Sequence, residues 1–134
     1  VQGMEKLGGI AIGIAALALL AGCAVAPAEP EATAIEAAVK DCKLERLKSV
    51  SIGDDGYSLI VNGYGKENTS GLPYEGISCL LDELEVPDST LAQVDNTRAH
   101  DGPQTGDGDD ITATWSYHPD SGPQFIFELA EPTD

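Results

Sequence analysis

The chain has 134 residues and a formal net charge of −16, with 23 acidic residues against seven Lys or Arg. This length suffices for one domain but is too short for the two lobes of a transporter's solute receptor. The negative charge repels nucleic acids and anionic lipid headgroups. We therefore expect no nucleic-acid partner and no membrane attachment through basic side chains. Solubility is the simplest role of the acidic residues, with cation binding as the alternative.

An apolar segment near the N-terminus, residues 7–22, leads directly into Cys23. It is shorter than the roughly 20 residues that a helix needs to cross a bilayer. A short apolar run that ends in small residues is instead typical of a secretory signal. We expect residues 1–22 to be a signal peptide, with an uncleaved anchor or a different cleavage point as alternatives. Whether the protein starts at Val1 or at Met4 stays open.

The end of this segment, Leu20-Ala21-Gly22-Cys23, resembles the lipobox of bacterial lipoproteins at all four positions. The resemblance implies that the Cys23 thiol receives a diacylglyceryl group and that a dedicated peptidase cleaves between Gly22 and Cys23. Cys23 would then be the first residue of the mature protein and carry more than one acyl chain, such as palmitate, which stable anchoring requires. The implied location is the extracytoplasmic face of the cell membrane, with the membrane as a partner through the lipid.

Residues 23–39 are rich in Ala, Pro and Glu, and we expect them to be a flexible tether. The Ala content from about Thr33 onward also allows a helix there. The remaining residues, 40–134, are predicted to form a single small domain. A domain of this size is marginally stable unless a covalent link supports it.

Such a link is predicted between Cys42 and Cys79, the two cysteines left after Cys23. In an oxidising extracytoplasmic space two thiols are expected to form a structural disulfide. Their spacing matches no zinc motif, and a zinc site would need two further ligands.

Alternating apolar residues in 50–52 and 57–61 flank Asp54-Asp55-Gly56, which predicts a β-hairpin. A helix is expected over 73–85, followed by a second short helix that begins at Asp88-Ser89-Thr90 with Leu91 and Val94 facing inward. The core face of the first helix is predicted from the i, i+3, i+4, i+7 spacing of Ile77, Leu80, Leu81 and Leu84. Cys79 falls nearly opposite that face, so the segment around Cys42 is expected to cross the outer side of the helix.

A second hairpin is predicted by alternation over 111–118 and 125–129 around the turn 119–123. Its aromatic face should pack on the helix and its Thr, Ser and His face should meet solvent. The element order ββααββ predicts an α+β domain with a small antiparallel sheet of two hairpins and two helices packed on one face. The stretch 71–89 followed by two strands is similar to small outer-membrane assembly lipoproteins and to β-lactamase-inhibitor-type repeats, an architectural likeness that carries no function.

Residues 101–110, DGPQTGDGDD, are expected to be a polar loop, with Asp107, Asp109 and Asp110 as weak candidates for Ca²⁺ ligands. An EF-hand that began at Asp107 would need an acid or Asn at 111 and Gly at 112, where the chain has Ile111 and Thr112. A solvated loop is the simpler interpretation.

The sequence contains no nucleophile elbow, phosphate-binding loop or HExxH motif. Ser116 and His118 lie in an open row on one strand face, and His100 stands beside Asp101, so neither histidine indicates a catalytic group. Trp115, Tyr117 and Phe127 are predicted to be core residues rather than a sugar-binding platform. No catalytic residue, cofactor or enzymatic activity is therefore expected.

The segments DDGYSL, GLPYEGISCLL, LEVPDST, TRAHDGPQ and TWSYHPDSG, within residues 41–129, resemble uncharacterised small lipoproteins and secreted proteins of high-GC Gram-positive bacteria. The resemblance implies a location and no chemistry. We expect a lipid-anchored, non-enzymatic domain that binds an envelope protein or another component of the cell envelope. The alternatives are a small-ligand or Ca²⁺ binder that uses loop 101–110, and an inhibitor of an envelope-acting enzyme.

Overall fold

The computed structural model describes residue 22 and residues 30–132. Residues 1–21 of the predicted signal peptide and the predicted lipidation site Cys23 lie outside the described residues. None of the described helices is both long enough and apolar enough to cross a bilayer.

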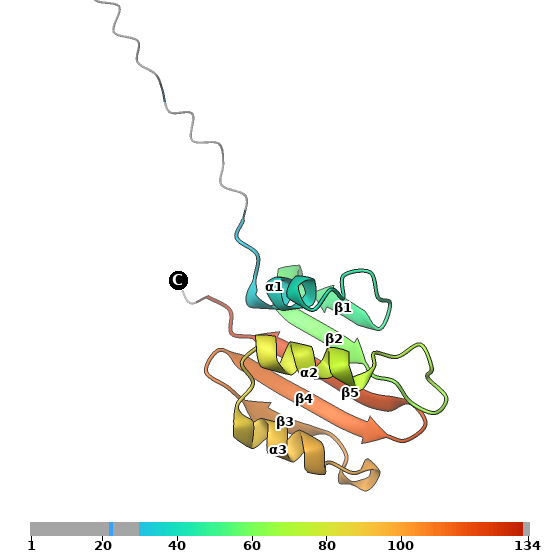
Figure 1. The fold of residues 1–134 in the computed structure, drawn as a ribbon. Helices are drawn as coiled ribbons and strands as arrows, with labels where there is room; N and C mark the ends of the chain where they lie inside the picture. The colour runs from blue at the N-terminus through green and yellow to red at the C-terminus, as the bar shows by residue number, and fades with distance from the viewer. Residues whose placement is uncertain (1–21, 23–29, 133–134) are drawn as a thin grey trace, which may run out of the picture.

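Three helices and five strands make up the described domain (Figure 1). In chain order they are α1 (Ala34–Asp41), β1 (Val50–Gly53), β2 (Ser58–Asn62), α2 (Tyr74–Glu83), α3 (Asp88–Asn96), β3 (Gln104–Asp107), β4 (Ile111–His118) and β5 (Gly122–Leu129). The strands form one sheet in the order β1-β2-β5-β4-β3, and all the neighbouring strands pair antiparallel. The predicted α+β class and antiparallel sheet are confirmed.

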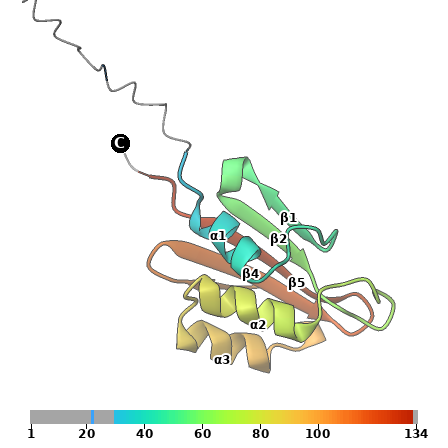
Figure 2. The ribbon, with the colours of Figure 1, turned by 45° about the horizontal axis from the view of Figure 1, so that its top comes forward.

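The sheet is covered on one face only, because all three helices lie on the same side of it (Figure 2). The covered face carries a row in which Leu59, Phe127 and Ala113 are register partners, and all three are buried. One residue along each strand, Ile60 and Ile126 are partners on the opposite face and are 42% and 37% exposed. Successive side chains of a strand point to opposite faces, so this alternation sets the register of the central strands.

Both predicted hairpins are confirmed. The first turns at Asp54–Gly56, where Asp54 and Asp55 join Gly56 in the left-handed backbone region. The second pairs β4 with β5 over their full length. The predicted loop 101–110 is wrong in part, since β3 pairs with β4 at its edge. Gly106 of β3 lies so close to Thr90 of α3 that a Cβ there would stand 2.6 Å from the threonine side chain, which explains the small residue.

Helix α2 confirms the predicted core face, because Ile77, Leu80, Leu81 and Leu84 are all buried. Helix α3 begins at Asp88, as predicted, and packs Leu91 and Val94 against the core. The connection between the two helices is short, and it places the first turn of α2 near the last turn of α3 (Figure 1).

The helix that the Ala content allowed from about Thr33 is present as α1, so the predicted flexible tether extends too far, and part of residues 34–39 belongs to the core. Ile35, Ala38 and Val39, at i, i+3 and i+4, are at most 2% exposed. Thr33 caps the helix with a capping box: Glu36 N donates to Thr33 Oγ1, and Thr33 N donates to Glu36 Oε2. The Thr33 hydroxyl also donates to Gly56 O at 2.7 Å, which ties the start of α1 to the first hairpin.

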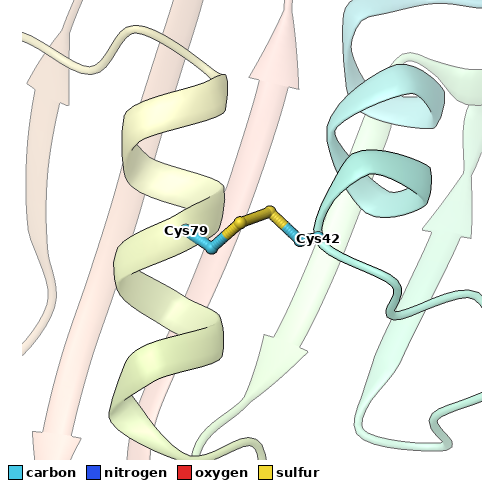
Figure 3. The surroundings of a disulfide bond; sticks show 2 residues. All are labelled: Cys42 and Cys79. Carbon is cyan, nitrogen blue, oxygen red and sulfur yellow. A yellow bond between two sulfur atoms is a disulfide. The ribbon is translucent and has the colours of Figure 1, made fainter.

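The predicted disulfide between Cys42 and Cys79 is present (Figure 3). Its Cα atoms are 6.0 Å apart, within the usual range for such a bond. The expectation that the segment around Cys42 crosses the outer side of α2 is wrong. Cys42 caps the end of α1, and α1 lies beside α2 on the same face of the sheet, so the bond joins the flanks of two neighbouring helices.

Candidate binding pocket

A pocket of about 280 Å³ opens between the start of α2, the end of α3 and the β4–β5 hairpin. Its apolar wall is formed by Ile77, Val94, Trp115, Pro123 and Phe125. Trp115 and Phe125 are register partners on the covered face of the sheet, and both are buried. The pocket is therefore an extension of the hydrophobic core to the surface.

The apolar wall is fixed by a hydrogen-bond chain at the end of α3. Trp115 Nε1 donates to Thr97 Oγ1 at 2.8 Å. The Thr97 hydroxyl in turn donates to the Gln93 carbonyl at 2.6 Å. The indole N–H of the chain's single tryptophan thus has a hydrogen-bond acceptor, and this bond holds β4 against the last turn of α3.

Two tyrosines and one carboxylate stand at the mouth of the pocket. Tyr74, at the start of α2, is 63% exposed, and Tyr117 on β4 is 41% exposed. Tyr117 shares the covered face with Trp115 but is exposed near the end of β4, so its prediction as a core residue is wrong. Trp115 and Phe127 are buried, as predicted.

The electrostatics of the mouth are set by Asp95. The Tyr74 hydroxyl donates a long hydrogen bond of 3.4 Å to Asp95 Oδ1. The pKa of Tyr74 is raised above its ordinary value, first by the charge of Asp95, then by burial, by this hydrogen bond and by the charge of Asp82. The charges of Asp95 and Asp82 thus create a negative electrostatic potential at Tyr74.

No basic side chain offsets that potential at the pocket, whose described lining contains no Lys, Arg or His. Across residues 30–132, the single ion pair joins His100 to Asp101 at 3.9 Å, so Asp95 has no cationic partner there. A carboxylate at an aromatic pocket without a counter-ion favours a positively charged ligand over a negative one.

The acidic residues of 101–110 do not converge. Asp101 accepts a hydrogen bond from Arg98 N, and Asp107 accepts one from the Thr112 hydroxyl across β3 and β4. Asp109 and Asp110 are exposed in the turn between these strands. Within the described part of the chain, no three His, Cys, Asp or Glu side chains are grouped to hold a metal ion.

Ser116 is half-buried and lines the pocket, whereas His118 is exposed and does not, and no hydrogen bond joins their side chains. His118 Nδ1 accepts instead from Asp120 N at 3.2 Å, a bond within the β4–β5 turn. His100, at 77% side-chain exposure, contacts Asp101 at the surface. These arrangements do not build a nucleophile and base around a pocket.

Tyr74 and Asp95 were not singled out from the sequence. They are 21 residues apart and meet because α2 and α3 pack side by side on the sheet. No local motif signals such a pair, although a tyrosine in the first turn of a helix and an acid in the last turn of the next are visible in the sequence.

Comparisons of the chain with protein-family models, with curated proteins and with solved structures give no match. The lipobox and the resemblance to small lipoproteins therefore stay predictions.

Proposed function

We propose that the chain is a lipid-anchored binding domain on the extracytoplasmic face of the membrane, and that it binds through this pocket without catalysing a reaction. The pocket carries the proposal, because an apolar wall with a few polar groups at its mouth is the usual form of a small-ligand site. Among the described residues, its lining contains one carboxylate, Asp95, and no His, Cys or Lys that would activate the Ser116 hydroxyl.

Two observations support the proposed location. The residues Leu20-Ala21-Gly22-Cys23 fit the lipobox at every position. The Cys42–Cys79 disulfide suits an oxidising compartment outside the cytoplasm, because cytoplasmic reductants keep such thiols apart.

The orientation of the domain also supports the proposal. The described chain enters at Thr33, beside Gly56, and leaves after Leu129, whose N–H donates to Tyr57 O at the same end of the sheet. The pocket lies at the opposite end, where β5 starts. Eight residues of β5 separate the two ends, a distance of roughly 25 Å. An anchor at Cys23 would therefore be joined to the domain at the end opposite the pocket.

Replacing Cys23 tests the anchor. In a bacterial host that processes lipoproteins, Cys23→Ala is expected to lose incorporation of a labelled fatty acid and to accumulate with its signal peptide attached. The reason is that alanine has no thiol to carry the thioether. Mass spectrometry of the N-terminus and in-gel detection of the label measure both effects. Val25→Ala, two residues further on, should be labelled and cleaved normally. Labelling and normal cleavage of Cys23→Ala would contradict the proposed anchor.

Small neutral solutes test whether the pocket binds at all. We expect amphipathic alcohols such as cyclohexanol to shift the Trp115 indole N–H resonance of the mature chain in a saturable way. Val94→Phe, which adds volume to the apolar wall, should weaken this binding about tenfold. Ala92→Phe, on the exposed side of the same helix, should leave it unchanged. If no solute gives a saturable shift, the pocket is not a binding site.

A further inference from the structure

We propose that the pocket between α2, α3 and β4 binds a quaternary ammonium group. This inference rests on the proposed function, since it names the ligand class for the same pocket. Three properties of the pocket lead to it: aromatic side chains at the mouth and in the wall, a carboxylate without a cationic partner, and an apolar wall whose side chains offer no hydrogen-bond acceptor.

The aromatic side chains come from three elements. Tyr74 belongs to α2, Trp115 and Tyr117 to β4, and Phe125 to β5. The face of an aromatic ring carries partial negative charge, so alkylated ammonium groups are attracted to sites lined by such rings. The two tyrosines are the exposed members and stand where an entering ligand would meet them first, whereas Trp115 and Phe125 are buried.

The negative charge around the pocket favours a cationic ligand. Asp95 lines the pocket, its carboxylate has no cationic partner within the described chain, and Asp82 adds negative potential near Tyr74. The whole chain has a formal net charge of −16, which raises the local concentration of any cation and repels anions. A phosphate, carboxylate or sulfate group would meet repulsion at Asp95 and no basic side chain in the lining.

The hydrogen-bonding groups distinguish a quaternary from a primary ammonium. A primary ammonium has three N–H donors that need acceptors once water is lost. The Thr97 hydroxyl already accepts from Trp115 and donates to Gln93, and one oxygen of Asp95 accepts from Tyr74. This leaves the second oxygen of Asp95 and the hydroxyls of Ser116 and Tyr117 as side-chain acceptors in the lining, whereas the apolar wall offers none. A quaternary ammonium has no N–H groups to satisfy, and its methyl groups can contact the apolar wall.

The size of the pocket limits the ligand to a small group. Its volume of about 280 Å³ lies just below the usual range for sites that enclose a whole drug-sized molecule. It therefore suits a trimethylammonium headgroup. Such a group is presented either by a free solute such as choline or by a phosphatidylcholine headgroup, and the experiment below separates these sources.

The test compares choline with 3,3-dimethyl-1-butanol, a neutral analogue in which carbon replaces the charged nitrogen. Both are titrated into the mature full-length chain while the Trp115 indole N–H resonance is followed by NMR. We expect choline to bind at least about tenfold more tightly than the neutral analogue. Ethanolamine, the primary ammonium counterpart, should also bind more weakly than choline. Vesicles of phosphatidylcholine, with phosphatidylglycerol vesicles as reference, test the lipid source by sedimentation.

Two variants and two matched controls locate the binding. Tyr117→Leu keeps apolar bulk but removes a ring, and it should weaken choline binding about fivefold. Asp95→Asn should weaken it about threefold. Tyr64→Leu changes a tyrosine of 55% exposure outside the pocket, and Asp88→Asn changes an acid at the other end of α3. Neither control should alter binding, and thermal melting verifies that each variant is folded.

The outcomes separate this inference from the proposed function. Equal affinity for choline and its neutral analogue would overturn the quaternary ammonium assignment, while the pocket would still be a binding site. Choline binding that is insensitive to both Tyr117→Leu and Asp95→Asn would place the site elsewhere and also overturn the assignment. Loss of binding for all solutes, neutral ones included, would remove the pocket-binding part of the proposed function as well.

Discussion

Replacing both Cys42 and Cys79 by alanine is expected to lower the free energy of unfolding by about 4 kcal/mol. The disulfide joins residues 37 positions apart, and in the chain-entropy description it restricts the unfolded chain by that amount. The total stability of a domain of this size is about 5–15 kcal/mol, so the loss is a large fraction of it. The melting temperature should fall by roughly 15–30 °C, measured by circular dichroism and checked by urea unfolding.

The same loss of stability can be produced by reducing the disulfide instead of replacing its cysteines. Reduction of the unaltered chain should lower its unfolding midpoint to that of the double variant, because both remove the same link between α1 and α2. Ser78→Ala, a neighbour of Cys79 on α2 that is only partly exposed, is the matched control and should change the midpoint little. A double variant with unaltered stability would mean that the noncovalent contacts of α1 already hold it on the sheet.

The contacts of α1 also show why composition alone predicts too long a tether. The composition of residues 23–39, rich in Ala, Pro and Glu, predicted a tether, yet Ile35, Ala38 and Val39 follow helical spacing and are buried. Composition averages over a segment and hides a short amphipathic pattern at its end. In contrast, the two hairpins, α2 and the disulfide follow from strict local patterns, and each is present.

Strand β3 and the pocket could not be predicted from the sequence, because both depend on tertiary contacts. Gln104–Asp107 contains no strongly strand-forming residue except Thr105, and it becomes a strand by pairing with the edge of β4. Tyr74 and Asp95 meet only when α2 and α3 pack side by side. Tyr117 continues the apolar alternation of β4, and the sequence does not reveal that this side chain stays exposed near the end of the strand.

Phe127→Ala is expected to destabilise the domain by about 3–5 kcal/mol, whereas Ile126→Ala next to it should cost about 1 kcal/mol or less. The two residues are adjacent on β5, the central strand, and point to opposite faces of the sheet. Phe127 is 1% exposed and lies nearly parallel to the ring of Phe125, with 5.6 Å between ring centroids. Its removal would leave a cavity beneath the helices.

Ile126 has no such cover within the described chain, since it is 37% exposed and its strand partner Ile60 is 42% exposed. Urea unfolding of both variants, with unchanged m-values, measures the difference. Similar losses for the two variants would contradict a sheet that is covered on one face only. A large difference would show that the core lies entirely between the sheet and the helices. The pocket wall would then depend on that core, because Phe125 stacks on Phe127 and also lines the pocket.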